Sequence, residues 1–214
     1  MRSGLLDSKL YRVCEWIARL AYINVLWILF TIVGLTLLGI APATVALFTI
    51  VRKWLLFQDD GIPVFKTFVR TYKKEFWSAN RIGLLFIAVA YILYIDVLYI
   101  AHVSAPWQLP FSVALLIMLV FYAVTLLYVF PIYVHYELRF WQYVKYAFLI
   151  GMANPFMTLA MIISLGILLV VLLYVPGLIP FFSISIFALI VMGSALRVFR
   201  KLESKQSVWQ QENK

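Results

Sequence analysis

Charged residues are scarce in this sequence, and cysteine and histidine are nearly absent. Asp, Glu, Lys and Arg make up 13% of the 214 residues, about half of the ~25% that is usual in soluble domains. A single cysteine, Cys14, excludes an internal disulfide, and two histidines are too few for a His-rich metal site. The standard P-loop, zinc-protease and serine-esterase motifs are missing, and carboxylates are too sparse for a glycosidase pair. We therefore expect no enzyme activity and no bound cofactor.

Apolar residues, in contrast, make up 65% of the chain, and its mean hydropathy is +0.98. In soluble domains, apolar residues make up roughly 45–50% of the sequence. A soluble protein of this size would expose apolar patches much larger than the few hundred Å² that soluble monomers tolerate. Disordered chains, which are poor in apolar residues, are excluded by the same numbers. The composition predicts an all-α integral membrane protein with a single membrane domain, residues 1–214.

Long apolar segments mark the expected membrane spans, since about 20 residues of helix cross a ~30 Å hydrocarbon core. A first apolar region, residues 21–57, is too long for one helix and contains Gly39-Ile40-Ala41-Pro42 near its middle. Because Gly and Pro interrupt helices, this region forms either one kinked span or a hairpin of two spans, 21–38 and 43–57. The other four expected spans are 82–101, 111–136, Pro155–Tyr174 and 178–196.

The distribution of Lys and Arg favours the hairpin. Residues 1–20 contain four of them, 51–81 seven, 137–146 two and 197–214 five, whereas 102–110 and 175–177 contain none. A hairpin places all 18 on one side of the membrane, and cytoplasmic loops are the ones that collect positive charge. We therefore expect six spans, with both termini in the cytoplasm. The alternative of a cleaved signal peptide fits poorly, because the apolar run exceeds the usual 7–15 residues.

Basic amphipathic segments precede each pair of spans, at residues 5–20, 64–79 and 138–150. Such helices lie in the membrane interface, where their cations attract anionic lipid headgroups rather than nucleic acid. Each segment is followed by an asparagine, Asn24, Asn80 or Asn154, a residue that caps helix N-termini. The pattern predicts three hairpins in three repeat-like units, 1–57, 58–136 and 137–201, with a disordered tail at 202–214. Chance is the alternative, in which case Asn24 forms hydrogen bonds between helices.

Asp96 is the one acidic residue within an expected span. It lies about 7–8 Å from the outer end of its helix, at 1.5 Å per residue. Carboxylates in lipid are costly, so they usually face protein or water. Asp96 is either a proton or cation site near an outward cavity or a carboxylate hydrogen-bonded to a tyrosine such as Tyr99, and the lack of a second intramembrane charge favours the latter.

The segment from Gly39 to Thr44, which includes Pro42, is a stronger candidate for function. A broken helix leaves backbone groups unpaired, and transporters use such breaks to bind substrates or ions. The alternative, which we favour, is a sharp hairpin tip, with small residues that allow close helix packing. Pro131 marks a second candidate, because tyrosines and His135 surround it near a cytoplasmic end. They predict either a kinked polar mouth or an interfacial aromatic belt with a proline kink, and we favour the belt.

Several short motifs resemble those of the YesL family of bacterial membrane proteins. They are Asn24-x-x-Trp27, Gly39-x-x-Pro42-Ala43-Thr44, Arg52-Lys53-Trp54, Phe65-x-x-Phe68, Phe76 before Asn80, Asn154, and Arg197-x-x-Arg200. The resemblance covers essentially the whole chain, and its Gly-x-x-Pro-Ala-Thr element is the most specific part. It implies a multi-helix membrane protein of Gram-positive bacteria, whose genes often lie beside those of carbohydrate ABC importers. It implies no catalytic residues.

The resemblance therefore leads us to expect a non-catalytic accessory or assembly subunit associated with carbohydrate uptake. An ABC importer permease is the partner it implies, and a homo-oligomer is compatible with the small-residue seams of the first hairpin. The alternative is a stand-alone transporter or channel for a small solute that uses Asp96 and the 39–44 segment.

Overall fold

The computed structural model describes residues 3–57, 61–102 and 108–212, with side chains for 11, 13–57, 61–102 and 108–204. All regular structure in these ranges is helical, as predicted. Six of the helical segments are long and apolar enough to cross a membrane. The helices are α1 Ser3–Val33, α2 Leu37–Phe57, α3 Val64–His102, α4 Gln108–His135, α5 Phe140–Ala153, α6 Pro155–Tyr174, the 3₁₀ turn η1 Pro176–Leu178 and α7 Ile179–Glu212.

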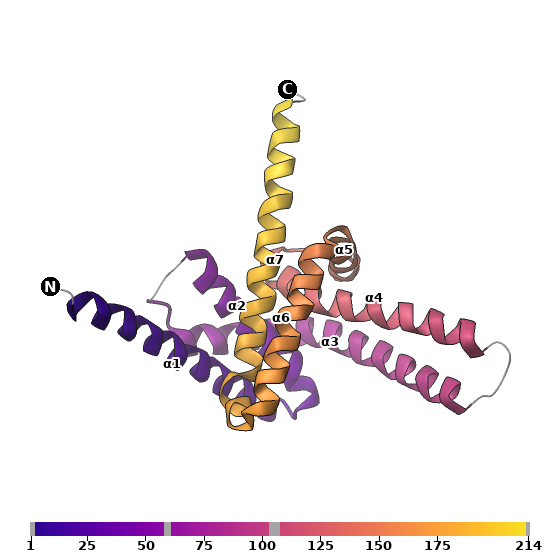
Figure 1. Ribbon diagram of the computed structural model, residues 1–214, viewed down its shortest axis with the longest axis horizontal. Coiled ribbons are helices and arrows are strands. Elements are labelled where there is room, and N and C mark those ends of the chain that lie inside the picture. Colours follow the sequence, from indigo (N-terminus) through magenta and orange to yellow (C-terminus); the bar gives the residue numbers. More distant parts are fainter. Residues whose placement is uncertain (1–2, 58–60, 103–107, 213–214) are drawn as a thin grey trace.

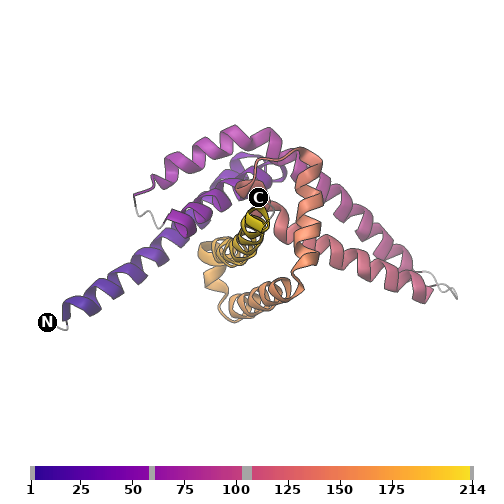
Figure 2. The same ribbon diagram turned by 90° about the horizontal axis from the view of Figure 1, so that it is seen from above.

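The helices form three hairpins, α1–α2, α3–α4 and α6–α7, around a core centred on α2. That helix is the most buried of the spans and contacts α1, α3, α4 and α7. Figure 2 shows α1 and the α3–α4 hairpin extending to opposite sides, with α6 and α7 between them. The short α5 packs on α4 and leads into α6 (Figure 1).

Four expected spans lie where the sequence placed them, and the bounds of α6, Pro155–Tyr174, agree exactly with the prediction. The first hairpin is confirmed, but its turn is at residues 34–36 rather than 39–42. Leu35 and Thr36 adopt left-handed backbone angles there, and Thr36 N–H donates to the carbonyl of Thr31 at 2.9 Å. This closure is of the Schellman type. The expected spans 21–38 and 43–57 are therefore corrected, since Gly39 and Pro42 lie inside α2.

The amphipathic segments are helical, but the first two continue into their spans without a break. Asn24 and Asn80 consequently lie in the interior of α1 and α3, where no free amides remain to be capped, and the N-cap prediction is wrong for both. Only the third segment is a separate helix, α5. Asn154 follows it at the start of α6, yet its side chain donates back to the carbonyl of Ile150 at 3.2 Å. The asparagine caps therefore give the threefold repeat no support.

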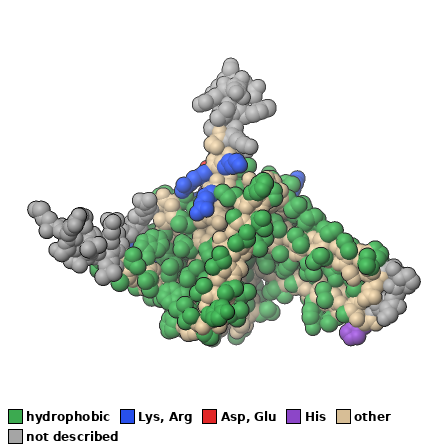
Figure 3. All heavy atoms as spheres, viewed as in Figure 1, with side chains coloured by type: hydrophobic (Ala, Val, Ile, Leu, Met, Phe, Trp, Pro, Cys, Tyr) green, Lys and Arg blue, Asp and Glu red, His purple; other side chains and the backbone are tan. Residues whose placement is uncertain are grey.

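The expected disordered tail is also corrected, because α7 continues as helix to Glu212. Residues 213 and 214 lie outside the described range. In Figure 3 hydrophobic side chains cover the hairpins, whereas the visible Lys and Arg side chains gather around α7. Arg197, Arg200 and Lys201 are the exposed cations of this helix within the described side chains. Cationic and apolar surfaces are thus separated, as a membrane protein requires.

Candidate functional site

A polar cavity lies where α2, α3 and α4 meet the start of α5. Its volume is about 360 Å³. Charged groups of both signs line it, together with tyrosines: Arg52, Lys74, Glu75, Tyr133, His135, Tyr136, Glu137 and Tyr143. The cavity lies at the same end of α4 as Pro131, which is buried one turn before His135. The cavity is compatible with the polar mouth, which was one of the two interpretations of the residues around Pro131.

A chain of side-chain contacts crosses this region from α2 to α7. Arg52 Nε donates to Nδ1 of His135 at 3.2 Å, and Nε2 of His135 lies 3.5 Å from Oε1 of Glu203. An arginine can only donate, so Nδ1 of His135 is the acceptor and the neutral ring carries its proton on Nε2. His135 also packs against Phe199, with ring centroids 4.8 Å apart. These contacts hold the ends of α2, α4 and α7 together.

A second set of contacts connects α4 with α3, and α5 with the connection that precedes it. Tyr133 donates from its hydroxyl to Oε2 of Glu75 at 2.6 Å, while Lys74 Nζ lies 3.5 Å from the other carboxylate oxygen. Tyr143 accepts from the amide of Leu138 at 3.0 Å. Both tyrosines are half-buried. The acidic and aromatic walls of the cavity are thus fixed by hydrogen bonds.

Tyr136 lies in the connection between α4 and α5, at the edge of the cavity. Its hydroxyl donates to Oε1 of Glu203 at 3.4 Å. Burial, followed by the negative charge of Glu203, raises the pKa of Tyr136 above its usual value of about 10. This hydroxyl is therefore protonated at neutral pH and available as a hydrogen-bond donor.

The cavity can bind a polar group through donors and acceptors together. Within the described residues, Arg52 uses only Nε in a hydrogen bond to protein, which leaves its two terminal nitrogens for another acceptor. Guanidinium groups suit carboxylates and phosphates. No group of three or more His, Cys, Asp or Glu side chains is arranged to hold a metal ion in this part of the chain. The geometry fits reversible binding of a small anionic or zwitterionic group.

Asn24, in contrast, is far from this cavity and connects α1 to α7. Its Nδ2 donates to the carbonyl of Pro180 at 2.7 Å, and its Oδ1 accepts from the amides of Ile184 and Ser185, each at 3.0 Å. The side chain is completely buried. Asn24 thus forms hydrogen bonds between helices, which was the alternative to a capping role.

Gly39, Pro42 and Thr44 all lie in α2, and Gly39 and Thr44 form a packing seam against α1. A Cβ atom on Gly39 would collide with the backbone of Thr31, so the two helices approach too closely for any larger residue. Thr44 Oγ1 accepts from Trp27 Nε1 at 3.0 Å and donates to the carbonyl of Ile40 at 2.7 Å. Because residues 39–44 are continuous helix, the broken-helix binding site is not formed there.

Asn80 and Asp96 are both on α3 but in opposite environments. Asn80 is buried, and its Nδ2 has no hydrogen-bond partner among the described residues. Asp96 is exposed on the surface of α3 and lines neither of the two cavities described for this protein. In the described part of the chain it forms no hydrogen bond with Tyr99 and no ion pair. The structure therefore does not bring Asp96 together with the other candidate residues.

Sequence reasoning missed the contact from Arg52 through His135 to Glu203. The partners are 83 and 68 residues apart, so no local motif contains them. The only signal in the sequence was the cluster of polar aromatic residues around Pro131. Its position at the end of an apolar span indicated a polar environment but not the partners.

Comparison with known proteins places the chain among bacterial relatives. The family described as "Protein of unknown function, DUF624" matches residues 20–97. Three Bacillus subtilis (strain 168) proteins described as uncharacterized are similar over most of their length. YesV is 42% identical, over 96% of this chain and 98% of YesV. YteU is 39% identical, over 92% of this chain and 87% of YteU. YesL is 37% identical, over 93% of each chain. No solved structure matches.

Proposed function

Because the chain belongs to the DUF624 family of YesL-like multi-pass membrane proteins, we propose that it is a non-catalytic accessory or assembly subunit of a membrane complex. The resemblance described above suggests a carbohydrate ABC importer as the complex and its permease as the partner. The setting that fits this role is the bacterial cytoplasmic membrane, with both termini in the cytoplasm. The cationic ends of the helices would then lie against the anionic headgroups of the inner leaflet.

The observation that carries the proposal is the α3–α4 hairpin. It extends away from the other helices (Figures 1 and 2). Only 11% of the most apolar 18-residue stretch of α3 is buried within the protein. Large apolar side chains on both helices are exposed along its length: Tyr91, Ile92 and Ile95 on α3, and Val113, Leu116 and Met118 on α4. In lipid, such surfaces associate with other helices through shape-matched packing.

The alternative is a stand-alone transporter or channel for a small solute. The polar cavity around Arg52 favours it, because a mixed-charge cavity at one end of a helix bundle can bind a solute. Two features that suggested transport are weakened, however. Asp96 lines neither cavity, and residues 39–44 are helical.

Affinity purification from native membranes in mild detergent tests the assembly role. We expect a permease to co-purify with the tagged protein, and Ile92→Trp with Leu116→Trp on the exposed face of α3–α4 to reduce its recovery at least tenfold. The matched control is Leu159→Trp on α6, which places the same bulk on an equally lipid-exposed helix. Unchanged recovery of the permease with the hairpin variant would contradict this surface as the contact.

Reconstitution of the purified protein alone into liposomes separates the two functions. An accessory subunit transports no solute by itself, and Asp96→Ala leaves sugar uptake by cells unchanged. Solute flux through the protein alone would overturn the accessory role, and loss of that flux in Arg52→Gln would assign it to the polar cavity.

A further inference from the structure

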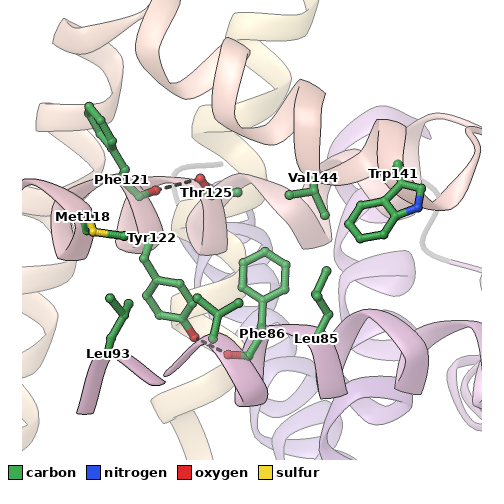
Figure 4. Close-up of a pocket in the computed structure, with 10 residues that line it drawn as sticks. Leu85, Phe86, Leu93, Met118, Phe121, Tyr122, Thr125, Trp141 and Val144 are labelled. Carbon is green, nitrogen blue, oxygen red and sulfur yellow. Dashed lines mark hydrogen bonds between the residues drawn. The ribbon is translucent and has the colours of Figure 1, made fainter. Parts of the chain in front are cut away.

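A second cavity lies between α3, α4 and α5 and is almost entirely apolar. Its volume is about 370 Å³. Leu85, Phe86, Val89 and Leu93 line it from α3, with Met118, Phe121, Tyr122 and Thr125 opposite on α4, and Trp141 and Val144 covering it from α5. In Figure 4, Leu85, Phe86, Leu93 and Tyr122 lie between α3 and α4, Trp141 and Val144 approach from α5, and the ring of Phe121 points away from α3. We call this cavity the α3–α4–α5 crevice.

The few polar groups of the crevice are already satisfied by the protein. Tyr122 donates to the carbonyl of Phe86 at 3.0 Å, and Thr125 donates to the carbonyl of Phe121 at 2.7 Å (Figure 4). Only the indole N–H of Trp141 forms no hydrogen bond among the described residues, and Trp141 is 70% exposed. A polar ligand would therefore lose its hydration without gaining partners, whereas a hydrocarbon would not.

The dimensions of the crevice match one hydrocarbon chain. From Leu85 to Leu93 it follows α3 for about 12 Å, at 1.5 Å rise per residue. Its volume is less than half of the ~900 Å³ that a helix of ~10 Å diameter would occupy over that length. A transmembrane segment of a partner is thus excluded as the occupant of the crevice itself.

Cationic residues lie one helical turn from lining residues of the crevice on both α3 and α5. Arg81 is one helical turn before Leu85 on the same face of α3, and Lys145 is one turn after Trp141 on the same face of α5. Both side chains are exposed and form no ion pair within the described part of the chain. The stretch of α3 that lines the crevice contains no acidic residue, and Asp96 lies beyond its opposite end. An apolar channel with a cationic rim is complementary to an anionic amphiphile.

We propose that the α3–α4–α5 crevice binds an anionic phospholipid, with one acyl chain along Leu85 to Leu93 and the headgroup at Arg81 and Lys145. Trp141 lies at the boundary, as interfacial tryptophans do. Because the interior of the bilayer is as apolar as the crevice, an acyl chain gains little free energy by moving from one to the other. Selectivity must then arise from the cationic rim, so that headgroup charge determines which lipid binds.

Quenching of tryptophan fluorescence by brominated lipids tests the proposal on the full-length protein in vesicles. Phosphatidylglycerol and phosphatidylcholine with identical brominated chains are each added at low mole fraction to unbrominated phosphatidylcholine. The Trp141 signal is the difference between wild type and Trp141→Phe. We expect the anionic lipid to quench it at a severalfold lower mole fraction than phosphatidylcholine. Equal quenching by the two lipids overturns the proposal.

Two sets of variants locate the site. Arg81→Gln and Lys145→Gln should each weaken the preference for phosphatidylglycerol about fivefold, which corresponds to ~1 kcal/mol per cation. The matched control Lys66→Gln, an exposed cation on α3 away from the crevice, should leave this preference unchanged.

Val89→Trp fills the crevice and should reduce lipid retention, measured by native mass spectrometry, whereas Ile163→Trp on α6 should not. Equal effects of Lys66→Gln and Lys145→Gln, or full lipid retention by Val89→Trp, would contradict the site. These readouts need no partner, so they are independent of the proposed assembly role.

Discussion

Asn24 shows how a single amide can connect two helices in lipid. In an unbroken helix the amide of Ile184 would bond the carbonyl of Pro180. The side chain of Asn24 contacts both of these groups, and also the amide of Ser185. Water is absent from the bilayer core, so these backbone groups need a protein partner. Asn24 therefore completes the first turns of α7 from a neighbouring helix.

Replacement of Asn24 by leucine should destabilise the protein by about 2 kcal/mol, since three interhelical hydrogen bonds are lost at roughly 0.6 kcal/mol each. Thermal unfolding in detergent, followed by size-exclusion chromatography, measures the effect. The matched control is Thr31→Val on the same helix, because the buried hydroxyl of Thr31 has no hydrogen-bond partner in the described part of the chain. That change should be neutral or slightly stabilising. Equal losses in the two variants would show that the hydrogen bonds of Asn24 contribute nothing specific.

Two tyrosines at the polar cavity offer a matched pair of Tyr→Phe substitutions. Tyr133 donates to Glu75 at 2.6 Å from a half-buried position, whereas Tyr136 reaches the more exposed Glu203 at 3.4 Å. A short bond to a carboxylate is among the stronger hydrogen bonds. Tyr133→Phe should cost about 1 kcal/mol in the same unfolding assay, and Tyr136→Phe less than ~0.5 kcal/mol. The reverse order would contradict the assigned contacts.

For single residues, the sequence identified the important positions more often than it identified their contacts. Asn24 stood out because it follows a basic amphipathic segment and asparagine caps helices, but its partners are about 160 residues away. Arg52 and Glu75 were counted only as charges, because nothing local pairs them with His135 and Tyr133. Contacts between distant segments depend on how the hairpins pack, which a single sequence does not encode in any short pattern.

The elements were predictable wherever apolar length alone defines them. The helix α6 begins at Pro155, which is suited to the first helical position, and its 20 residues match the thickness of the bilayer. The turn between α1 and α2 was misplaced because Gly39 and Pro42 are usual turn residues, whereas Leu35 and Thr36 are not. Left-handed angles at two residues other than glycine are costly. The close packing of α1 on α2 evidently outweighs that cost.

Gly39 therefore serves the contact between two elements rather than a turn. A Cβ atom there would overlap the backbone of Thr31, which cannot rotate away as a side chain can. Gly39→Ala should destabilise the α1–α2 hairpin by about 1–3 kcal/mol, the usual cost of overpacking. Gly166→Ala in α6 is the control, since a Cβ atom there meets no other atom within 4 Å. It should stabilise by about 0.5–1 kcal/mol through helix propensity. Thermal unfolding of both variants in detergent tests the contrast, and a neutral Gly39→Ala would refute the close approach.

Over the whole molecule, two uncharged turns and two cationic segments lie at opposite ends. The turn at residues 34–36 and the 3₁₀ turn η1 lie at one end, and α5 and the end of α7 lie at the other (Figure 1). The cationic residues of α5 and α7 are at the second end, and η1 contains none. This separation is what the positive-inside rule requires of a protein with an even number of spans. It makes the direction of insertion a property of the entire chain.

Cysteine labelling can measure that direction. In a Cys14→Ser background, we expect Gly177→Cys in η1 to react with a membrane-impermeant maleimide in intact cells, because η1 is exposed and connects two spans at the uncharged end. Lys66→Cys, on the cationic first part of α3, should react only after the membrane is permeabilised. Labelling of both positions in intact cells would mean that α3, α4 and α6 do not all cross the membrane, because three spans place residues 66 and 177 on opposite sides. Labelling of Lys66→Cys alone would reverse the orientation, and would move the cationic rim of the α3–α4–α5 crevice to the outer leaflet.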